Sequence, residues 1–246
     1  MIISTKIFFI KMRLLLTFSP TSEFSYDCID KHTIQGLIYS LLGDSEYGAY
    51  HDLKRFKFFT FSDIFPIGDF TIAENKNLLI SSPDPRFIRS IEDGLKGRDT
   101  LKLGNYSVWI KGYRIINLGL MNRFISASPI VLYKDNKSNL YFSFERDKNL
   151  DFFLERLKEN AIKKYNAFYS TDFTLKENIF DRLKFRKEVA VKLRKKNEEF
   201  IIIGSVWKLL EKFKISMENR KFYRFIMDSG LGEKNSLGFG FINPMR

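Results

Sequence analysis

Apolar positions in the first part of the chain follow the spacings of strands and helices in turn. A Leu-rich run at residues 12–18 predicts a first strand, and residues 25–42 predict a helix that Gly43 ends. The apolar residues of that helix recur at the i, i+3, i+4, i+7 and i+8 positions, which places them on one face. Residues 45–53 predict a short second helix.

The following segments complete one supersecondary unit. Residues 56–62 predict a strand because they are mostly aromatic and contain no helix or strand breaker, and residues 77–81 predict another. Pro85 begins a helix that runs to about residue 95, and residues 106–118 return to a strand. The order β-α-β-β-α-β is that of a ferredoxin-like unit.

The second half of the chain predicts the same order again. Its segments are strands at 126–133 and 140–144, a helix at 150–169, a long hairpin of 179–195 and 200–208 turned at Asn197, Glu198 and Glu199, a helix at 216–228 and a last strand at 239–242.

We therefore predict an α+β fold of two tandem ferredoxin-like (RRM-like) βαββαβ domains. The boundary is expected near residues 119–124, which gives an N-terminal domain at 1–120 and a C-terminal domain at 121–246. The second domain would carry a basic hairpin and a glycine-rich loop. This duplication rests on the pattern of elements, because the two halves share no sequence repeat.

The net charge of the chain indicates which kind of partner it binds. The 246 residues include 41 Lys and Arg against 29 Asp and Glu, for a net charge of +12. Such an excess favours a polyanionic partner, either nucleic acid or an anionic membrane surface. An AT-rich genome also enriches Lys, Asn, Ile and Phe, which is an alternative source of part of the charge. A membrane is not expected, because the chain has neither an apolar run of about 20 residues nor a basic amphipathic helix with an exposed apolar face.

Cysteine and histidine are too scarce for several classes of site. Cys28 is the single cysteine, so an internal disulfide is excluded and a reducing, cytoplasmic location is expected. With His32 and His51 as the two histidines, a His-rich or thiolate metal centre is not expected. Asp63 and Asp69 do not belong to a carboxylate set of the kind that a two-metal nuclease uses. We therefore expect no metal and no cofactor.

Basic residues gather in the first strand of the predicted hairpin. Residues 182–196 hold eight of them against Glu188, and the even positions share one face of a strand. A row of cations at that spacing could track a phosphate backbone, and the alternative is a solvated outer face. The predicted RNA-binding residues on this face are Arg182, Lys184, Arg186, Lys192, Arg194 and Lys196.

A glycine-rich segment joins the last predicted helix to the last strand. It differs from a P-loop and from a dinucleotide-binding fingerprint, because the helix precedes the strand. Glycine allows a ligand to approach backbone N–H groups, and the alternative is a helix cap followed by a bulged strand. The residues that we expect at RNA here are Gly230, Gly232, Lys234, Asn235, Ser236, Gly238 and Gly240.

Candidate catalytic groups lie near the third predicted element. His51 precedes a basic segment that includes Lys57. At a phosphodiester, a histidine can donate a proton to the leaving oxygen and a lysine can stabilise the developing negative charge. Tyr39 lies off the apolar stripe of the first helix, and His32 shares its face seven residues earlier. That face either borders the same site or packs against the other domain.

These residues resemble a known family at both ends of the chain. The glycine-rich segment 230–240 is similar to the C-terminal signature of the CRISPR repeat-processing endoribonucleases, the Cas-six branch of the repeat-associated RNA-binding superfamily. Near the N-terminus, residues 35–39, 50–53 and 57–62 follow the order and spacing of that family.

The resemblance implies a fold, a substrate and a reaction. It implies two ferredoxin-like domains and cleavage of precursor CRISPR RNA within the repeat, without a metal. A ribose 2′-hydroxyl would attack the adjacent phosphate and leave a 2′,3′-cyclic phosphate and a 5′-hydroxyl. By residue-to-residue match, His51 and Tyr39 would share proton transfer, and Lys57 would stabilise the charged phosphate.

Several alternatives stay open at this point. Tyr39, His51 or His32 could accept the 2′-hydroxyl proton, although a neutral tyrosine is a poor base, which favours positioning for Tyr39 and acid catalysis for His51. The protein could instead be a non-catalytic RNA-binding subunit of a CRISPR effector complex. A larger effector complex and a second copy of the chain are the further partners that the resemblance allows.

Overall fold

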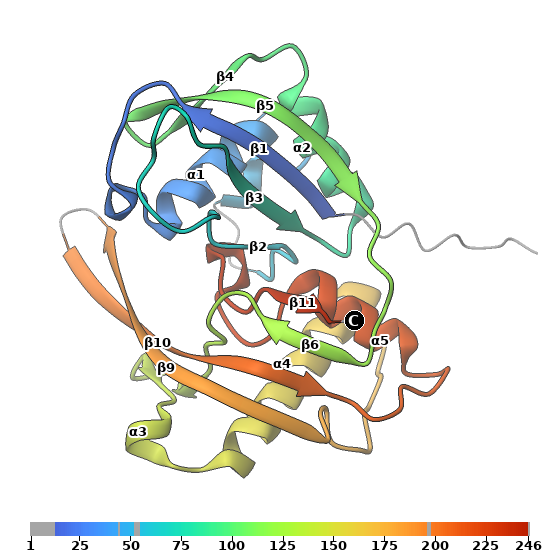
Figure 1. Ribbon diagram of the computed structural model, residues 1–246. Helices are drawn as coiled ribbons and strands as arrows, with labels where there is room; N and C mark the ends of the chain where they lie inside the picture. The colour runs from blue at the N-terminus through green and yellow to red at the C-terminus, as the bar shows by residue number, and fades with distance from the viewer. Residues whose placement is uncertain (1–12, 44, 52–54, 196–197, 246) are drawn as a thin grey trace, which may run out of the picture.

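Two separate antiparallel sheets organise the molecule (Figure 1). The computed structural model describes residues 13–43, 45–51, 55–195 and 198–245. The first sheet has the strand order β2-β3-β1-β5-β4. Its strands are β1 (Arg13–Pro20), β2 (Thr60–Phe61), β3 (Lys76–Ser81), β4 (Thr100–Leu103) and β5 (Tyr106–Ile116).

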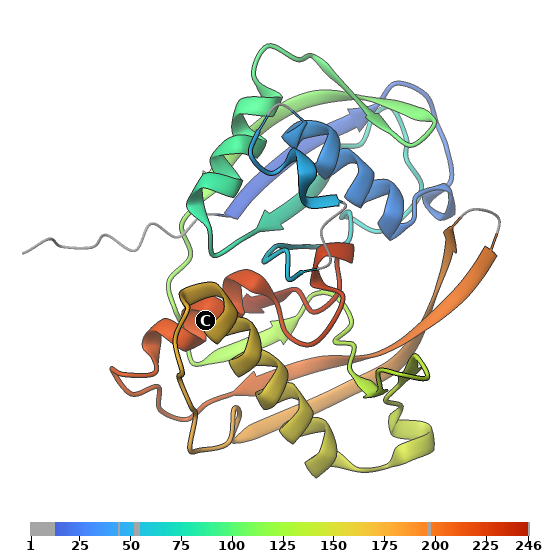
Figure 2. The same ribbon diagram turned by 180° about the vertical axis from the view of Figure 1, so that it is seen from behind.

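Helices cover one face of this first sheet (Figure 2). Strand β1 turns Leu14, Leu16 and Phe18 into the core, and all three are fully buried. Nearby side chains cap the helices. At the start of α1, for example, the Asp30 side chain accepts a hydrogen bond from the Thr33 N–H at 2.8 Å. The helical elements of this half are η1 (Tyr26–Cys28), α1 (Lys31–Leu42), η2 (Gly48–His51) and α2 (Pro85–Leu95).

The second sheet has the strand order β11-β6-β10-β9. Helices α4 and α5 share a buried core with β6 and β10, and a small β7–β8 hairpin lies beside it. The strands are β6 (Arg123–Ser126), β7 (Tyr133–Asp135), β8 (Leu140–Tyr141), β9 (Arg182–Lys195), β10 (Glu198–Glu211) and β11 (Ile242–Pro244). The helices are α3 (Phe144–Asp147), α4 (Leu150–Tyr169), α5 (Arg220–Ser229) and η3 (Asn235–Leu237).

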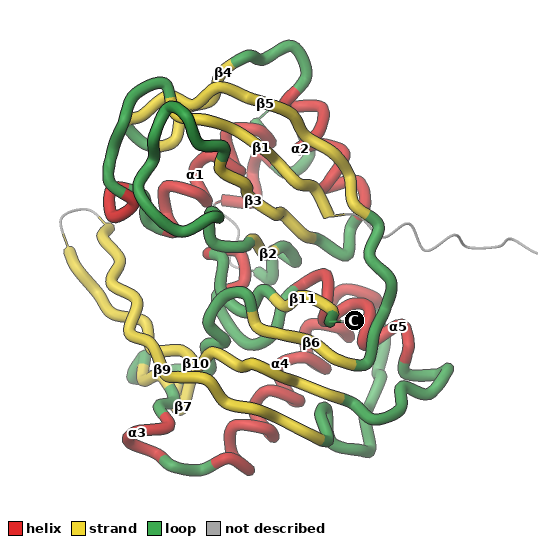
Figure 3. The backbone as a smooth tube through the Cα atoms, in the orientation of Figure 1, coloured by secondary structure: helices red, strands yellow, loops and turns green. Residues whose placement is uncertain are grey.

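The two sheets have the same topology. In chain order, each unit places its second strand next to its third, then its first and then its last: β2-β3-β1-β5 in one and β9-β10-β6-β11 in the other. Together with two helices per unit, this arrangement confirms the predicted tandem ferredoxin-like fold. The first sheet ends at Ile116 and the second begins at Arg123, and the predicted boundary at 120/121 falls in the loop between them (Figure 3).

Several elements differ from the sequence predictions. The strand expected at 56–62 is reduced to Thr60–Phe61, because Phe58 has a left-handed backbone (φ 49°) that interrupts an extended run. Strand β4 was missed, and it forms a hairpin with β5 around Gly104 (φ 62°). Of the helix expected at 45–53, the described residues 45–51 contain a single 3-10 turn, η2, and residues 52 and 53 lie outside the described residues.

Other predicted elements are shorter or displaced. The strand expected at 126–133 ends at Ser126, and Pro129, which has no N–H to donate, interrupts the pairing before Ile130 bridges to Ser205. The last strand begins at Ile242 and not at 239, because the glycine-rich segment packs as a loop. The turn expected at 197–199 is also wrong at Glu198 and Glu199, which belong to β10; Asn197 lies outside the described residues.

Polar contacts join the two domains. The Arg13 side chain of β1 is buried and donates to Asn243 Oδ1 and Met227 O, both at 2.6 Å, and to Ile242 O at 2.8 Å. Two strands away on the same row of the sheet, the Thr60 hydroxyl donates to Phe239 O at 3.1 Å. These bonds fix the position of the second domain's C-terminal segment against the first sheet.

The closest helix packing supplies a stability prediction. Gly94 of α2 lies so near α1 that an added Cβ would come within 2.1 Å of Leu41 O. We expect Gly94→Ala to lower the free energy of unfolding by about 1–3 kcal/mol through overpacking, as measured by urea unfolding. Gly36→Ala on exposed α1 surface, where nothing lies within 4 Å, is the matched control and should be neutral or stabilising. Equal effects of the two changes would contradict this packing.

Candidate functional site

Tyr39 and Lys57 meet although they come from different elements. Tyr39 projects from α1, and its ring packs edge-on against Phe59 at 5.9 Å between centroids. Lys57 precedes β2, and its Nζ lies 5.5 Å from the centroid of the Tyr39 ring. Burial raises the pKa of Tyr39 to about 12, so the phenol is protonated at neutral pH. Tyr39 is therefore suited to donate a hydrogen bond and not to act as a base.

The structure describes the side chain of only one of the two candidate histidines. The backbone of His51 forms the end of η2, and its side chain lies outside the described part of the structure. His32 is half-buried on α1, and its ring contacts the Phe200 ring of β10 edge-on at 6.1 Å. His32 thus faces the β9–β10 hairpin, about 10 Å along the helix from Tyr39.

Lys164 organises the glycine-rich loop, defined here as residues 230–240. This lysine projects from α4 and is only 3% exposed. Its Nζ donates to Gly230 O at 2.7 Å, Gly232 O at 3.0 Å and Asn235 Oδ1 at 2.7 Å. Burial lowers the pKa of Lys164 to about 7, and the charge of Glu233 opposes that shift. The sequence contained a signal for it, because Lys164 continues the apolar face of α4 that Phe153 and Leu157 begin.

Asn235 completes the internal bonding of the loop. Its Nδ2 donates to Leu231 O at 2.9 Å and to Phe239 O at 3.0 Å, while its Oδ1 accepts from Lys164. The side chain thus ties both ends of the loop to α4. Asn235 was predicted at RNA, and here it has a structural role whether or not RNA also contacts it.

The four glycines of the loop are buried and pack against protein. An added Cβ would lie 2.3 Å from Phe61 Cε2 at Gly238, 2.4 Å from Val131 O at Gly232 and 1.8 Å from Leu231 O at Gly240. Gly230 caps α5 with φ 83°. These positions demand glycine for packing and for positive φ, as in the cap-and-bulge alternative. The RNA contacts predicted for the four glycines stay a prediction.

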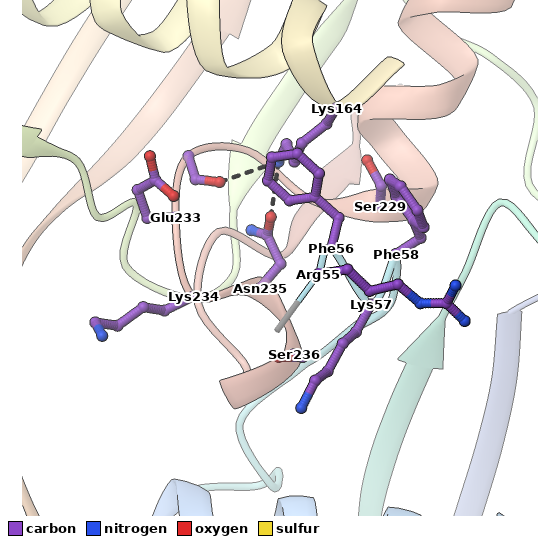
Figure 4. A pocket seen from close by; sticks show the side chains of 11 residues that line it. Arg55, Phe56, Lys57, Phe58, Lys164, Ser229, Glu233, Lys234, Asn235 and Ser236 are labelled. Atoms are coloured by element: carbon purple, nitrogen blue, oxygen red, sulfur yellow. Dashed lines mark hydrogen bonds between the residues drawn. The ribbon is translucent and has the colours of Figure 1, made fainter. Parts of the chain in front are cut away.

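A pocket of about 160 Å³ lies between the two domains beside this loop (Figure 4). The segment 55–58 forms one wall, and residues 232–236 with Lys164 and Ser229 form the other. The side chains of Arg55, Lys57 and Lys234 extend outward around it. Such a cationic rim is suited to an anionic group such as a phosphate.

The hairpin strand β9 is basic, but its charges are partly neutralised. Arg182 pairs with Glu211, and Lys192 and Arg194 both pair with Glu199, at 2.5 and 2.8 Å. Glu199 had been assigned to the turn, which hid its position opposite Arg194. Register shifts near Trp207 also interrupt the strict alternation. Within the described residues, Lys184 and Arg186 are exposed without an ion pair; Lys196 lies outside them.

The two acidic residues considered as metal ligands make ordinary structural contacts. Asp63 accepts from Lys31 Nζ at 2.7 Å, and Asp69 accepts from the Tyr26 N–H at 2.9 Å. Across the described ranges, no group of three or more His, Cys, Asp or Glu side chains is placed to hold a metal ion. Among the same residues, no helix has both the length and the apolar character to cross a membrane.

Comparison with known proteins places the chain in a family. Residues 118–244 match the family described as "CRISPR associated protein Cas6, C-terminal". The chain is 51% identical over 241 residues to "CRISPR-associated endoribonuclease Cas6 2" of Methanocaldococcus jannaschii, covering 96% of this chain and 100% of that protein. The chain belongs to the Cas6 family of CRISPR-associated endoribonucleases.

Two further relatives agree with this membership. "CRISPR-associated endoribonuclease Cas6 1" of the same organism is 31% identical over 78% of this chain and 75% of its own length. A solved structure named "CRISPR associated protein Cas6" superposes with a TM-score of 0.70 at 25% identity and covers 96% of this chain and 100% of its own. The predicted family and the predicted endoribonuclease class are thereby confirmed.

The buried lysine of this Cas6 chain yields a pH-dependent prediction. Lys164→Met removes three hydrogen bonds and should lower the free energy of unfolding by about 1–3 kcal/mol. Because the pKa of Lys164 falls from its ordinary 10.5 to about 7 in the fold, the unfolded chain binds more protons between those values. The contribution of Lys164 therefore rises with pH across that window, and the deficit of the variant should be larger at pH 9 than at pH 6.

The measurement is urea unfolding at both pH values. Lys163→Met, at the exposed neighbouring position of α4, is the matched control and should change little at either pH. A deficit that shrinks as pH rises would contradict the lowered pKa.

Proposed function

We propose that this protein cleaves precursor CRISPR RNA within the repeat, to generate mature guide RNAs for antiviral defence. The ribose 2′-hydroxyl attacks the adjacent phosphate without the help of a metal ion. The P–O5′ bond then breaks and leaves a 2′,3′-cyclic phosphate and a 5′-hydroxyl. The observation that carries this proposal is the meeting of Lys57 and Tyr39 beside a cation-rimmed pocket that the glycine-rich loop completes.

The residues divide the work by their chemistry. Lys57 stabilises the extra negative charge that develops on the phosphate oxygens in the transition state. Tyr39, protonated at neutral pH, positions the substrate by donating a hydrogen bond. His51 gives a proton to the departing 5′ oxygen. With His51 as the acid, His32 is the remaining candidate to accept the 2′-hydroxyl proton, since Tyr39 is a poor base.

RNA binding in this proposal uses exposed cations on both domains. Lys184 and Arg186 on β9 contact phosphates, as do Arg55 and Lys234 beside the pocket. Structures of similar fold include one named "An RAMP protein binding different RNA substrates", at 20% identity. A likeness at that level concerns the fold, so the RNA path here is argued from the charges of this chain.

The reaction is tested with the host's repeat RNA in EDTA. A matched RNA carries a 2′-deoxyribose immediately before the cut. We expect the ribose substrate to be cut and the deoxy substrate to stay intact, because the 2′-hydroxyl is the nucleophile. Binding of both RNAs with no cleavage of either would instead identify an RNA-holding subunit.

Substitutions at the site separate chemistry from binding. We expect Lys57→Ala to slow single-turnover cleavage by about 100- to 1,000-fold, because it removes a group that stabilises the transition state, and to leave the RNA dissociation constant within a few-fold. Lys96→Ala, at an exposed lysine that caps the C-terminal end of α2, is the matched control. A Lys57 variant that cuts at the wild-type rate would remove this residue from the mechanism.

The two halves of strand β9 should differ in their salt dependence. Replacing Lys184 and Arg186 together by Ala should reduce the slope of log K against log salt by about 1.4, since each lost phosphate contact on a single strand contributes about 0.7. The same double change at Lys192 and Arg194 should have a smaller effect, because the single carboxylate of Glu199 already neutralises one of their two charges. An unchanged slope in the first variant would exclude β9 from the RNA path.

A further inference from the structure

Phe56 lies where two pockets meet. It lines the pocket beside the glycine-rich loop, and it also lines a second pocket that includes Arg156, Asn160 and Lys163 of α4. Glu233 is the other residue that both pockets share. Because the two pockets share these two lining residues, they adjoin and form one surface that leads from Lys57 across α4.

The position of Phe56 is set by its neighbour. The left-handed backbone of Phe58 turns that ring into the second domain, where it contacts Phe168 at 5.0 Å and Phe225 at 6.3 Å between centroids. The carbonyl of Phe58 is held by the Ser82 hydroxyl at 2.8 Å. Phe56 packs against Phe58 at 5.8 Å and is itself only half-buried, so its ring remains at the pocket surface (Figure 4).

Cations precede and follow Phe56 in the chain, and another lies in the second pocket. Arg55 and Lys57 are its chain neighbours, and Lys163 lies in the second pocket. The carboxylates nearby are engaged, since Glu233 accepts from Asn160 at 2.8 Å and Glu159 pairs with Arg156 at 3.0 Å. A half-exposed ring at a pocket surface with cations nearby is an arrangement suited to single-stranded RNA, with the base stacked and the phosphates paired.

We propose that Phe56 stacks on the nucleobase next to the scissile phosphate and guides the adjoining single strand from Lys57 over α4. This inference rests on the proposed function, because it takes Lys57 to be the residue at the scissile phosphate. Phe56 and Lys57 are consecutive, so a phosphate at one places a base of the same or the adjacent nucleotide within reach of the other. Phe56 therefore positions the cleavage site and contributes to its selection.

The test is a cycle of protein and RNA changes. Wild type, Phe56→Ala, Phe56→Leu and Phe56→Trp are each measured for binding and single-turnover cleavage of the repeat RNA. A series of RNAs, each with one abasic nucleotide near the cut, supplies the second change. Phe213→Ala, at an aromatic residue that is 64% exposed and lies beyond β10, is the matched control.

On intact RNA we expect Phe56→Ala and Phe56→Leu to weaken binding by about 5- to 100-fold, and Phe56→Trp to bind like wild type. With one abasic RNA, and that one alone, the Ala and Leu variants should bind as well as wild type, because the stacking partner is already absent. Phe56→Leu preserves apolar bulk, so weaker RNA binding by this variant reports the loss of stacking and not a failure to fold.

The proposal is overturned if Phe56→Leu binds intact RNA like wild type, or if the loss is the same with every abasic RNA. Failure of the proposed function would give a different result. If wild type binds but does not cut, the cleavage mechanism is wrong, while the binding arm of the cycle still decides whether Phe56 stacks a base.

Discussion

The hydrogen bonds of one buried lysine fix the glycine-rich loop, and the candidate site depends on that loop. Lys164 reaches from α4 to three oxygens of the glycine-rich loop, and Asn235 relays that contact to both ends of the loop. Desolvation of an ammonium group is costly, so such a lysine is stable only where several acceptors face it. The loop and α4 therefore form one unit, and the pocket wall is fixed before any ligand enters.

The same loop fastens the two domains together. Gly238 lies against the Phe61 ring, and its carbonyl accepts from Lys31 Nζ at 2.9 Å. The Gln35 side chain donates to Ser236 O at 2.6 Å. The residues that resemble a family signature at the two ends of the chain thus touch one another. The sequence pattern at these two ends therefore reflects a domain interface as well as a candidate ligand site. Glycine is needed where the backbone of one domain meets an aromatic ring of the other.

The candidate catalytic centre follows from this docking. Helix α1 carries both Tyr39 and the residues that bind the loop, so its position against the second domain also sets the position of Tyr39. Phe58 inserts into the second domain and orients the segment that presents Lys57. Tyr39 and Lys57 of one domain lie beside a pocket wall that the other domain builds, an arrangement suited to the proposed reaction at an RNA phosphate.

The sequence by itself determined the order of most elements, the tandem fold and the family to which the chain belongs, because helix and strand periodicities, caps and chain motifs are local. It predicted α4 at the bounds that the structure has, and the strands of the β9–β10 hairpin to within three residues at each end. Tertiary structure alone decided that Lys164 is buried, that Glu199 faces Arg194 and that Phe58 packs against the core of the second domain while Phe56 lines the pocket. Those outcomes depend on contacts between residues far apart in the chain, which no local pattern encodes.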